Sequence, residues 1–111
     1  MCQQNDVLHT DYGGLHLDGS LWFTRGILEI YSDAIVLTRE RVLRQRRYVL
    51  PRKSITRLHP EPQLFWFLFS GGLRIEHTLA AHPQFLFYSR DIEVLTLKLQ
   101  QNGFPISTSN A

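Results

Sequence analysis

The residues best suited to chemistry in this sequence are its five histidines, two of which stand two positions before an aspartate. His9 precedes Asp11 and His16 precedes Asp18. On an extended strand, side chains two residues apart share a face, so each pair could offer a metal ion two ligands. Two ligands do not complete a site, and Cys2 is the only cysteine, which excludes a site built from several thiolates. We therefore predict neither a metal nor any other cofactor.

A third histidine, His77, ends an alternating apolar segment and shares one face of the predicted strand with Leu73 and Ile75. Because it stands at the end of that strand, we predict a histidine at the rim of the core, hydrogen-bonded to loop backbone. A titrating contact with a ligand is the alternative. His82 precedes Pro83 in the following loop and is expected to be exposed.

The compact motifs that assemble a catalytic site are missing from the sequence. It contains no G-x-S-x-G nucleophile elbow, no phosphate-binding P-loop and no H-E-x-x-H metal motif. The glycine pair at 71–72 is not followed by a helix, so it is not expected to cradle a phosphate. We therefore predict that the protein is not an enzyme.

Basic residues are concentrated in one segment, positions 39–57. The segment holds eight lysines and arginines against one acid, Glu40, which gives it a net charge of +7. The rest of the chain has four bases and nine acids, a net charge of −5, so the overall +2 describes neither part. Guanidinium groups donate paired hydrogen bonds to carboxylate or phosphate. If an anionic partner binds, we predict that it contacts Arg39, Arg41, Arg44, Arg46 and Arg47.

Residues 42–50 of this segment are predicted to form a strand with arginines on both faces. Arg44 and Arg46 alternate with Arg47, so the strand is expected to project beyond the core or to lie at a sheet edge. A solvated edge that resists aggregation is the alternative to a binding role. Tyr48 is the only aromatic residue of the basic segment, which argues against a nucleic-acid partner.

The run LFWFLF, residues 64–69, is apolar on both faces of a predicted strand. A small bent sheet has one inner face to fill, and a contiguous apolar patch on its outside usually marks an interface. We therefore predict a homodimer or another protein partner packed against Phe65, Phe67 and Phe69. The alternative is that the C-terminal helix and residues 1–20 cover this face.

The elements that must position these residues follow from a period of two that begins near residue 22. The predicted strands span residues 22–31, 34–38, 42–50, 54–59, 64–69, 73–78 and 85–88. Gly71 and Gly72 are predicted to form a hairpin turn. A helix follows, with Ser89 as its N-cap and Gly103 as its C-terminal stop. Phe104 is expected to fold back as an anchor.

These elements predict a mainly β (α+β) fold in a single domain. A helix with one apolar stripe needs an apolar surface to cover, and strands joined by tight turns pair antiparallel. We expect a bent antiparallel sheet, or partly open barrel, of about seven strands capped by one C-terminal helix. Its division would be a polar lead-in over 1–20, the domain over 21–106 and a tail over 107–111.

The predicted location is the cytoplasm. The N-terminus lacks the basic and apolar regions of a secretory signal. The longest apolar run, Leu64–Phe69, is far shorter than the roughly 20 residues that a transmembrane helix needs. We expect no transmembrane segment.

Two stretches, GILEIYSDAIVLTRERVLRQRRYVLPRKSITRL (26–58) and FLFYSRDIEVLTLKLQQNG (85–103), carry a family resemblance. Their order of strands, turns and closing helix resembles that of small bacterial pleckstrin-homology-like (PH-like) domains. The resemblance implies a scaffold that recognises phosphoinositide headgroups or, very often, proteins and peptides. Headgroup-binding members carry a basic cluster between their first two strands, whereas the predicted loop here, YSDA, contains an acid.

From this resemblance we expect a non-enzymatic interaction module whose partner is a protein, a second copy of the chain included. The alternative is an anion-binding module for a lipid headgroup or nucleic acid that acts through residues 39–57. Because of the YSDA loop, peripheral contact with a membrane is the weaker form of that alternative.

Overall fold

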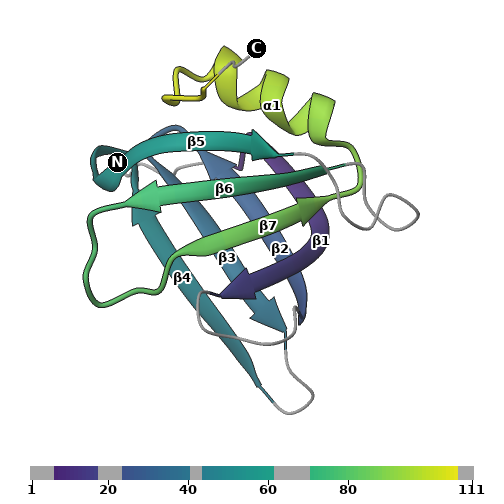
Figure 1. Ribbon diagram of the computed structural model, residues 1–111, viewed down its shortest axis with the longest axis vertical. Coiled ribbons are helices and arrows are strands. Elements are labelled where there is room, and N and C mark those ends of the chain that lie inside the picture. The colour runs from purple at the N-terminus through teal and green to yellow at the C-terminus, as the bar shows by residue number, and fades with distance from the viewer. Residues whose placement is uncertain (1–6, 18–23, 41–43, 62–70, 108–111) are drawn as a thin grey trace, which may run out of the picture.

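The computed structural model describes residues 7–17, 24–40, 44–61 and 71–107, which form one antiparallel sheet and a C-terminal helix (Figure 1). The strands are β1 (His9–Leu17), β2 (Thr24–Tyr31), β3 (Ala34–Glu40), β4 (Gln45–Pro51), β5 (Ile55–Glu61), β6 (Gly71–His77) and β7 (Phe85–Ser89). A 3-10 turn (Arg52–Ser54) precedes β5, and α1 spans Ile92–Gln101. The sheet order β4-β3-β2-β1-β7-β6-β5 leaves the sheet open. The predicted mainly β class, with about seven strands and one closing helix, is confirmed.

The sheet bends at β1, which pairs with β2 on one side and with β7 on the other. Gly13 of β1 lies opposite Gly26 of β2, and the backbones approach closely there. A Cβ on Gly13 would overlap the carbonyl oxygen of Tyr88, and one on Gly26 would lie 2.7 Å from Cβ of Leu15. Glycines thus permit the corner, and β5, β6 and β7 cross in front of β2, β3 and β4 (Figure 1).

The core fills the space between the two halves of the bent sheet. Strand alternation turns one face of each strand inward. The fully buried core side chains include Leu28, Ile30, Ile35, Leu37, Leu50, Leu58, Leu73, Ile75 and Phe87. Leu95 and Leu99 of α1 are also fully buried, so the helix closes one end of this core (Figure 1).

The helix begins two residues later than a Ser89 cap would place it. Asp91 is the N-cap, and its carboxylate accepts a hydrogen bond of 3.2 Å from the backbone N–H of Val94. Ser89 ends β7, and its Oγ accepts from the N–H of Asp91 at 3.0 Å. The predicted stop is confirmed, because Gly103 has a φ of 78°, in the left-handed region that favours glycine.

The chain after the helix returns to the sheet, as predicted. Phe104 is buried in the core, and Ile106 packs partly against it. Ile106 forms a parallel bridge with Leu58 of β5, and the N–H of Leu58 donates to the carbonyl of Pro105 at 2.9 Å. This tail therefore covers the outer edge of β5.

The prediction of an irregular lead-in is wrong for residues 9–17, which form a central strand. The sequence pattern hid this strand because its inner face carries Asp11 and Gly13 before the apolar Leu15 and Leu17. Small residues are needed where β1 turns the corner, so apolar alternation is confined to its last few positions. A strand with a neighbour on each side draws its stability from two sets of backbone hydrogen bonds.

The predicted hairpin turn at Gly71 and Gly72 is also wrong, since both are buried residues of β6. A Cβ on Gly71 would lie 2.9 Å from Cγ2 of Ile92, so glycine here allows the helix to approach the sheet. The predicted strand at 64–69, with Phe65, Phe67 and Phe69, lies outside the described residues.

Candidate interaction surface

Strand β4 separates the predicted arginines onto two faces of the sheet. Tyr48 and Leu50 are buried in the core, so the even positions of β4 face inward and the odd positions face outward. Arg46 pairs with Arg39 across β3 and β4, whereas Arg47 pairs with Thr38 on the outer face.

Of the five predicted arginines, the structure therefore brings only Arg39 and Arg46 together on one face. Arg44 is exposed just before β4. Arg41 lies outside the described residues. The predicted edge position of the strand is confirmed, because β4 ends the sheet.

Arg39 and Arg46 lie at the inner rim of the sheet, next to a cluster of rings. The Arg46 guanidinium lies 5.9 Å from the centroid of the Tyr48 ring. The centroid of the Tyr48 ring lies 5.4 Å from the centroid of the His82 ring and 5.0 Å from that of the Phe85 ring. Nε of Arg39 is buried and has no hydrogen-bond partner among the residues that the structure describes, which is costly for a charged donor. The exposed guanidinium of Arg46 beside it offers accessible donors to an anion with oxygen acceptors.

The prediction for His77 is confirmed by its hydrogen bonds. The residue is 8 % exposed; Nε2 donates to the carbonyl of Pro83 at 2.9 Å, and Nδ1 accepts from the N–H of Leu79 at 3.1 Å. These two partners fix the tautomer, and they tie the β6–β7 connection to the core. His82 is half-buried against Tyr48, so the expectation of an exposed side chain is wrong.

The outer face of β2, β3 and β4 carries an apolar depression that was not predicted from the sequence. Ile35 and Leu37 point into the core, so Val36 between them points outward. Val36 is nevertheless only 3 % exposed. Beside it Val49 is 47 % exposed. The depression holds about 360 Å³. We call its lining the outer patch: Tyr31, Asp33, Ala34, Val36, Arg47, Val49 and Pro51.

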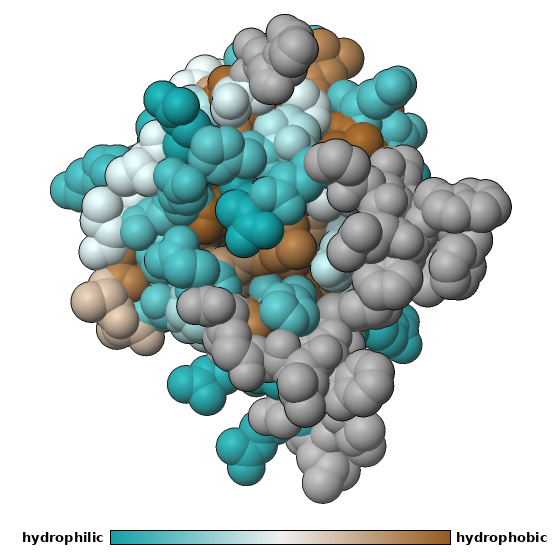
Figure 2. Space-filling view, in the orientation of Figure 1, coloured by the Kyte–Doolittle hydropathy of each residue, from teal (hydrophilic) through white to brown (hydrophobic). Residues whose placement is uncertain are grey.

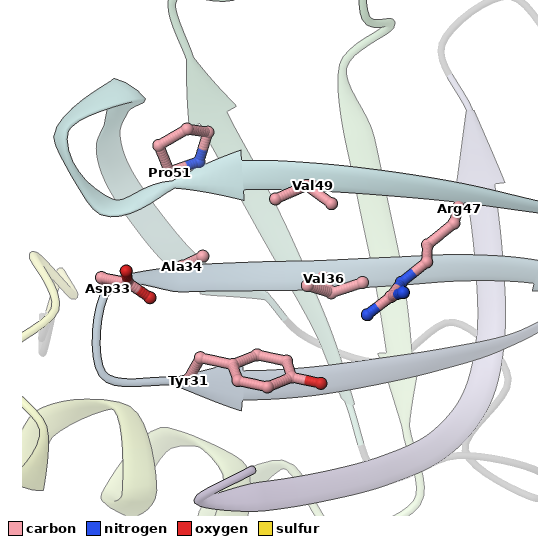
Figure 3. A pocket seen from close by; sticks show the side chains of 7 residues that line it. All are labelled: Tyr31, Asp33, Ala34, Val36, Arg47, Val49 and Pro51. Atoms are coloured by element: carbon pink, nitrogen blue, oxygen red, sulfur yellow. The ribbon is translucent and has the colours of Figure 1, made fainter. Parts of the chain in front are cut away.

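The outer patch has a charge at each end of an apolar centre. Figure 3 shows Arg47 reaching from β4 across β3 beside Val36, with Asp33 in the β2–β3 turn at the far end. The uninterrupted apolar run from Ile35 to Leu37 was the available signal. An antiparallel sheet with one solvated face normally shows alternating apolar and polar residues. An uninterrupted apolar run instead places apolar side chains on both faces of the strand.

Another base of the segment, Arg52, has a structural role. Its guanidinium donates to the carbonyls of Ser32 at 3.0 Å, Gly103 at 2.9 Å and Asn102 at 2.5 Å. It also lies 4.1 Å from the centroid of the Phe104 ring. Arg52 therefore joins the two residues that follow α1 to the β2–β3 turn, and its cation at the C-terminal end of the helix also complements the helix dipole.

Charged side chains on the outside of β5 and β6 satisfy one another. Arg74 donates to both carboxylate oxygens of Glu61, at 2.5 and 3.0 Å, and this hydrogen bonding raises the pKa of Arg74. Nε2 of His59 and Oε2 of Glu76 lie 3.0 Å apart.

On the face shown in Figure 2, polar residues cover much of the described surface, with small apolar areas between them.

Asp11, two residues after His9, is hydrogen-bonded to a serine. Ser89 donates to the Asp11 carboxylate at 2.5 Å, and burial raises the pKa of Asp11. Among the described residues, no group of three or more histidine, cysteine or acidic side chains could hold a metal ion. Asp18 lies outside them.

Neither a protein-family model nor a curated protein matches the chain. Solved structures do. The C-terminal domain of an unknown protein from Leishmania infantum superposes with a TM-score of 0.63 at 10 % identity, over 88 % of this chain and 84 % of that one. The hSac2 domain from the human phosphoinositide phosphatase Sac2 gives 0.60 at 16 % identity, over 100 % of this chain and 81 % of that one. These likenesses concern the fold alone.

In the part of the chain that the structure describes, no helix has the length and hydrophobicity required to cross a bilayer.

Proposed function

We propose that this chain is a non-enzymatic, PH-like interaction module that binds a protein partner through the outer patch. The observation that carries the proposal is Val49, which is 47 % exposed on the outward face of the sheet, beside the nearly covered Val36. The solvated face of an antiparallel sheet is ordinarily polar. Here an apolar floor lies between flanking polar residues, which is the composition of a protein interface: an apolar centre with a polar rim.

The position of the outer patch in the sheet also favours a protein partner. It spans β2, β3 and β4, and β4 is the end of the sheet whose outer edge no described residue pairs with. At the other end, the bridge between Leu58 and Ile106 covers β5. An incoming chain thus finds apolar surface and open backbone groups side by side.

Photocrosslinking tests this proposal. A benzophenone amino acid is placed at Val49 in one variant and at Val94, a similarly exposed valine on α1, in another. In cells that produce the protein, we expect a discrete protein adduct from position 49 and none from position 94, and we expect Arg47→Glu, a substitution at an exposed position of the outer patch, to remove it. Equal labelling from both positions, or from neither, would overturn the proposal.

A second candidate function is the binding of an anionic ligand at Arg39 and Arg46. The observation that favours it is the pairing of the exposed Arg46 with Arg39, whose buried Nε meets no hydrogen-bond partner in the described parts of the chain. The YSDA loop joins β2 to β3 and not the first two strands; the connection between the first two strands, residues 18–23, also contains no lysine or arginine, so any headgroup would have to be held by the arginines of β3 and β4. The hSac2 domain belongs to a phosphoinositide phosphatase.

Titration with a soluble inositol polyphosphate tests this second function. Arg46→Gln should abolish binding, whereas Arg47→Gln, its neighbour on the other face, should leave it unchanged. Binding through phosphate contacts must also weaken steeply with salt. If both variants bind like the wild type, the anion site is refuted.

A further inference from the structure

The two charges of the outer patch lie at opposite ends of its apolar centre. Arg47 pairs with Thr38 of β3, and Asp33 immediately precedes Ala34, the first residue of that strand. At about 3.3 Å per residue, the backbone positions of the two charges differ by about 16 Å along the strand direction. Val36 and its partner Val49 lie between them.

This arrangement is complementary to itself under a two-fold rotation. A two-fold axis that lies between the two faces, parallel to the sheet and perpendicular to its strands, and that passes over Val36 and Val49, brings the positive end of one patch onto the negative end of the other. Two-fold contacts require such a surface, in which residue i meets residue j and j meets i. An unrelated protein would need an acid opposite Arg47 and a base opposite Asp33 at the same spacing, whereas a second copy provides both by symmetry.

We infer that the partner of the outer patch is a second copy of this chain, packed face to face about that two-fold axis. The inference rests on the proposed function, because it uses the same surface. Val49 of each copy then meets apolar atoms of the other, and Arg47 of each copy pairs with the partner's Asp33. Sheets packed in this way lie about 10 Å apart with strands within about 30° of each other.

The arginine is suited to this contact. Arg47 has no ion-pair partner among the described residues, and its guanidinium lies over the apolar floor beside Val36 (Figure 3). Removing water from this region strengthens the pairing of a guanidinium with a carboxylate. Apolar burial supplies affinity, and the two charge pairs set the orientation.

Charge reversal tests the symmetry directly. In Arg47→Asp, both contacts of the dimer become acid against acid; in Asp33→Arg, both become base against base. We expect sedimentation to show a dimer for the wild type at about 1 to 100 μM and at least about tenfold weaker association for each variant. Mixing the two variants should restore the dimer, because each contact then pairs an acid with a base.

The mixing result separates an interface from a folding defect, since a variant that fails to fold cannot be rescued in the mixture. Val49→Glu, at the centre of the patch, should give a folded monomer, and the matched variant Val94→Glu on α1 should remain dimeric. A wild type that stays monomeric, or a mixture that does not associate, would overturn the inference. A discrete adduct of different mass at position 49 would then still support the proposed function.

Discussion

Arg46 and Arg47 are neighbours in the chain but lie on opposite faces of the sheet. Arg46 faces Arg39 at the inner rim of the sheet, and Arg47 faces Thr38 on the outer patch. A dense run of bases in an extended strand therefore serves two surfaces. The consequence is that substituting all the arginines together would mix the effects on the two proposed functions, which single substitutions keep apart.

Arg52 is expected to contribute more to stability than the other bases of its segment. Arg52→Gln removes hydrogen bonds to three backbone carbonyls and the contact with Phe104. We expect a loss of about 2 kcal/mol in the free energy of unfolding, measured by urea denaturation. Lys53→Gln, the exposed neighbour, should change it by less than about 0.5 kcal/mol. Equal effects of the two variants would contradict the structural role of Arg52.

His77 is expected to be a structural histidine. His77→Ala removes a buried ring and leaves the carbonyl of Pro83 and the N–H of Leu79 without their partner. The expected cost is about 2 to 4 kcal/mol. His82→Ala, which removes only ring contacts, should cost about 1 kcal/mol. Thermal unfolding of both variants measures the difference, and a His77→Ala variant as stable as the wild type would refute the role.

Asp11 makes stability depend on pH. Its pKa in the folded protein is raised above the ordinary value of 3.8, chiefly by burial and against the opposing effect of the Ser89 hydrogen bond. The folded state therefore binds the proton more tightly than the unfolded state. This stabilising contribution is present below the unfolded pKa and is lost as the pH rises through the folded pKa.

Asp11→Asn tests this linkage, because the amide oxygen can still accept from Ser89 while the charge is removed. The variant should be more stable than the wild type at neutral pH, and the difference should vanish at pH values below 3.8. Asp91→Asn is the control, since asparagine also caps a helix well; it should not stabilise the protein. Urea denaturation at several pH values checks both, and a destabilised Asp11→Asn variant at neutral pH would contradict the prediction.

Gly71 is expected to be required for the contact between helix and sheet. Gly71→Ala places a methyl group 2.9 Å from Cγ2 of Ile92, which should cost about 1 to 3 kcal/mol. Combining it with Ile92→Ala should recover part of that loss, because the second change removes the clash. A double-mutant cycle measures this coupling. Additive effects would show that the two residues do not crowd each other.

The sequence predicted those elements whose inner face is apolar at every second position. Strands β2, β3, β6 and β7 and the helix fall in this class, since Leu28 and Ile30 or Leu95 and Leu99 reveal their period. Strand β1 could not be found in the same way. Close packing at the corner requires glycine in β1. Because glycine has no apolar side chain, the alternation of apolar residues that would predict a strand is missing there.

The candidate surface was predicted only in part, for a similar reason. The alternation of Tyr48 and Leu50 with Arg47 could place the arginines on separate faces, but the sequence alone did not say which face was buried. The partnership of Arg39 with Arg46 depends on the register of β3 against β4, and register is set by tertiary packing. The predicted interface at 64–69 lies outside the described residues.

The place of β1 in the sheet has a consequence for synthesis. Strands β1 to β4 are neighbours both in the chain and in space, so they can pair as soon as they emerge from the ribosome. The other edge of β1 can pair only after β7 has been synthesised. Until then, the backbone N–H and C=O groups on that edge of β1 can pair with another nascent chain. Protein released after β4 should therefore aggregate, and the rate of complete folding should depend on the long-range closure of β1 with β7.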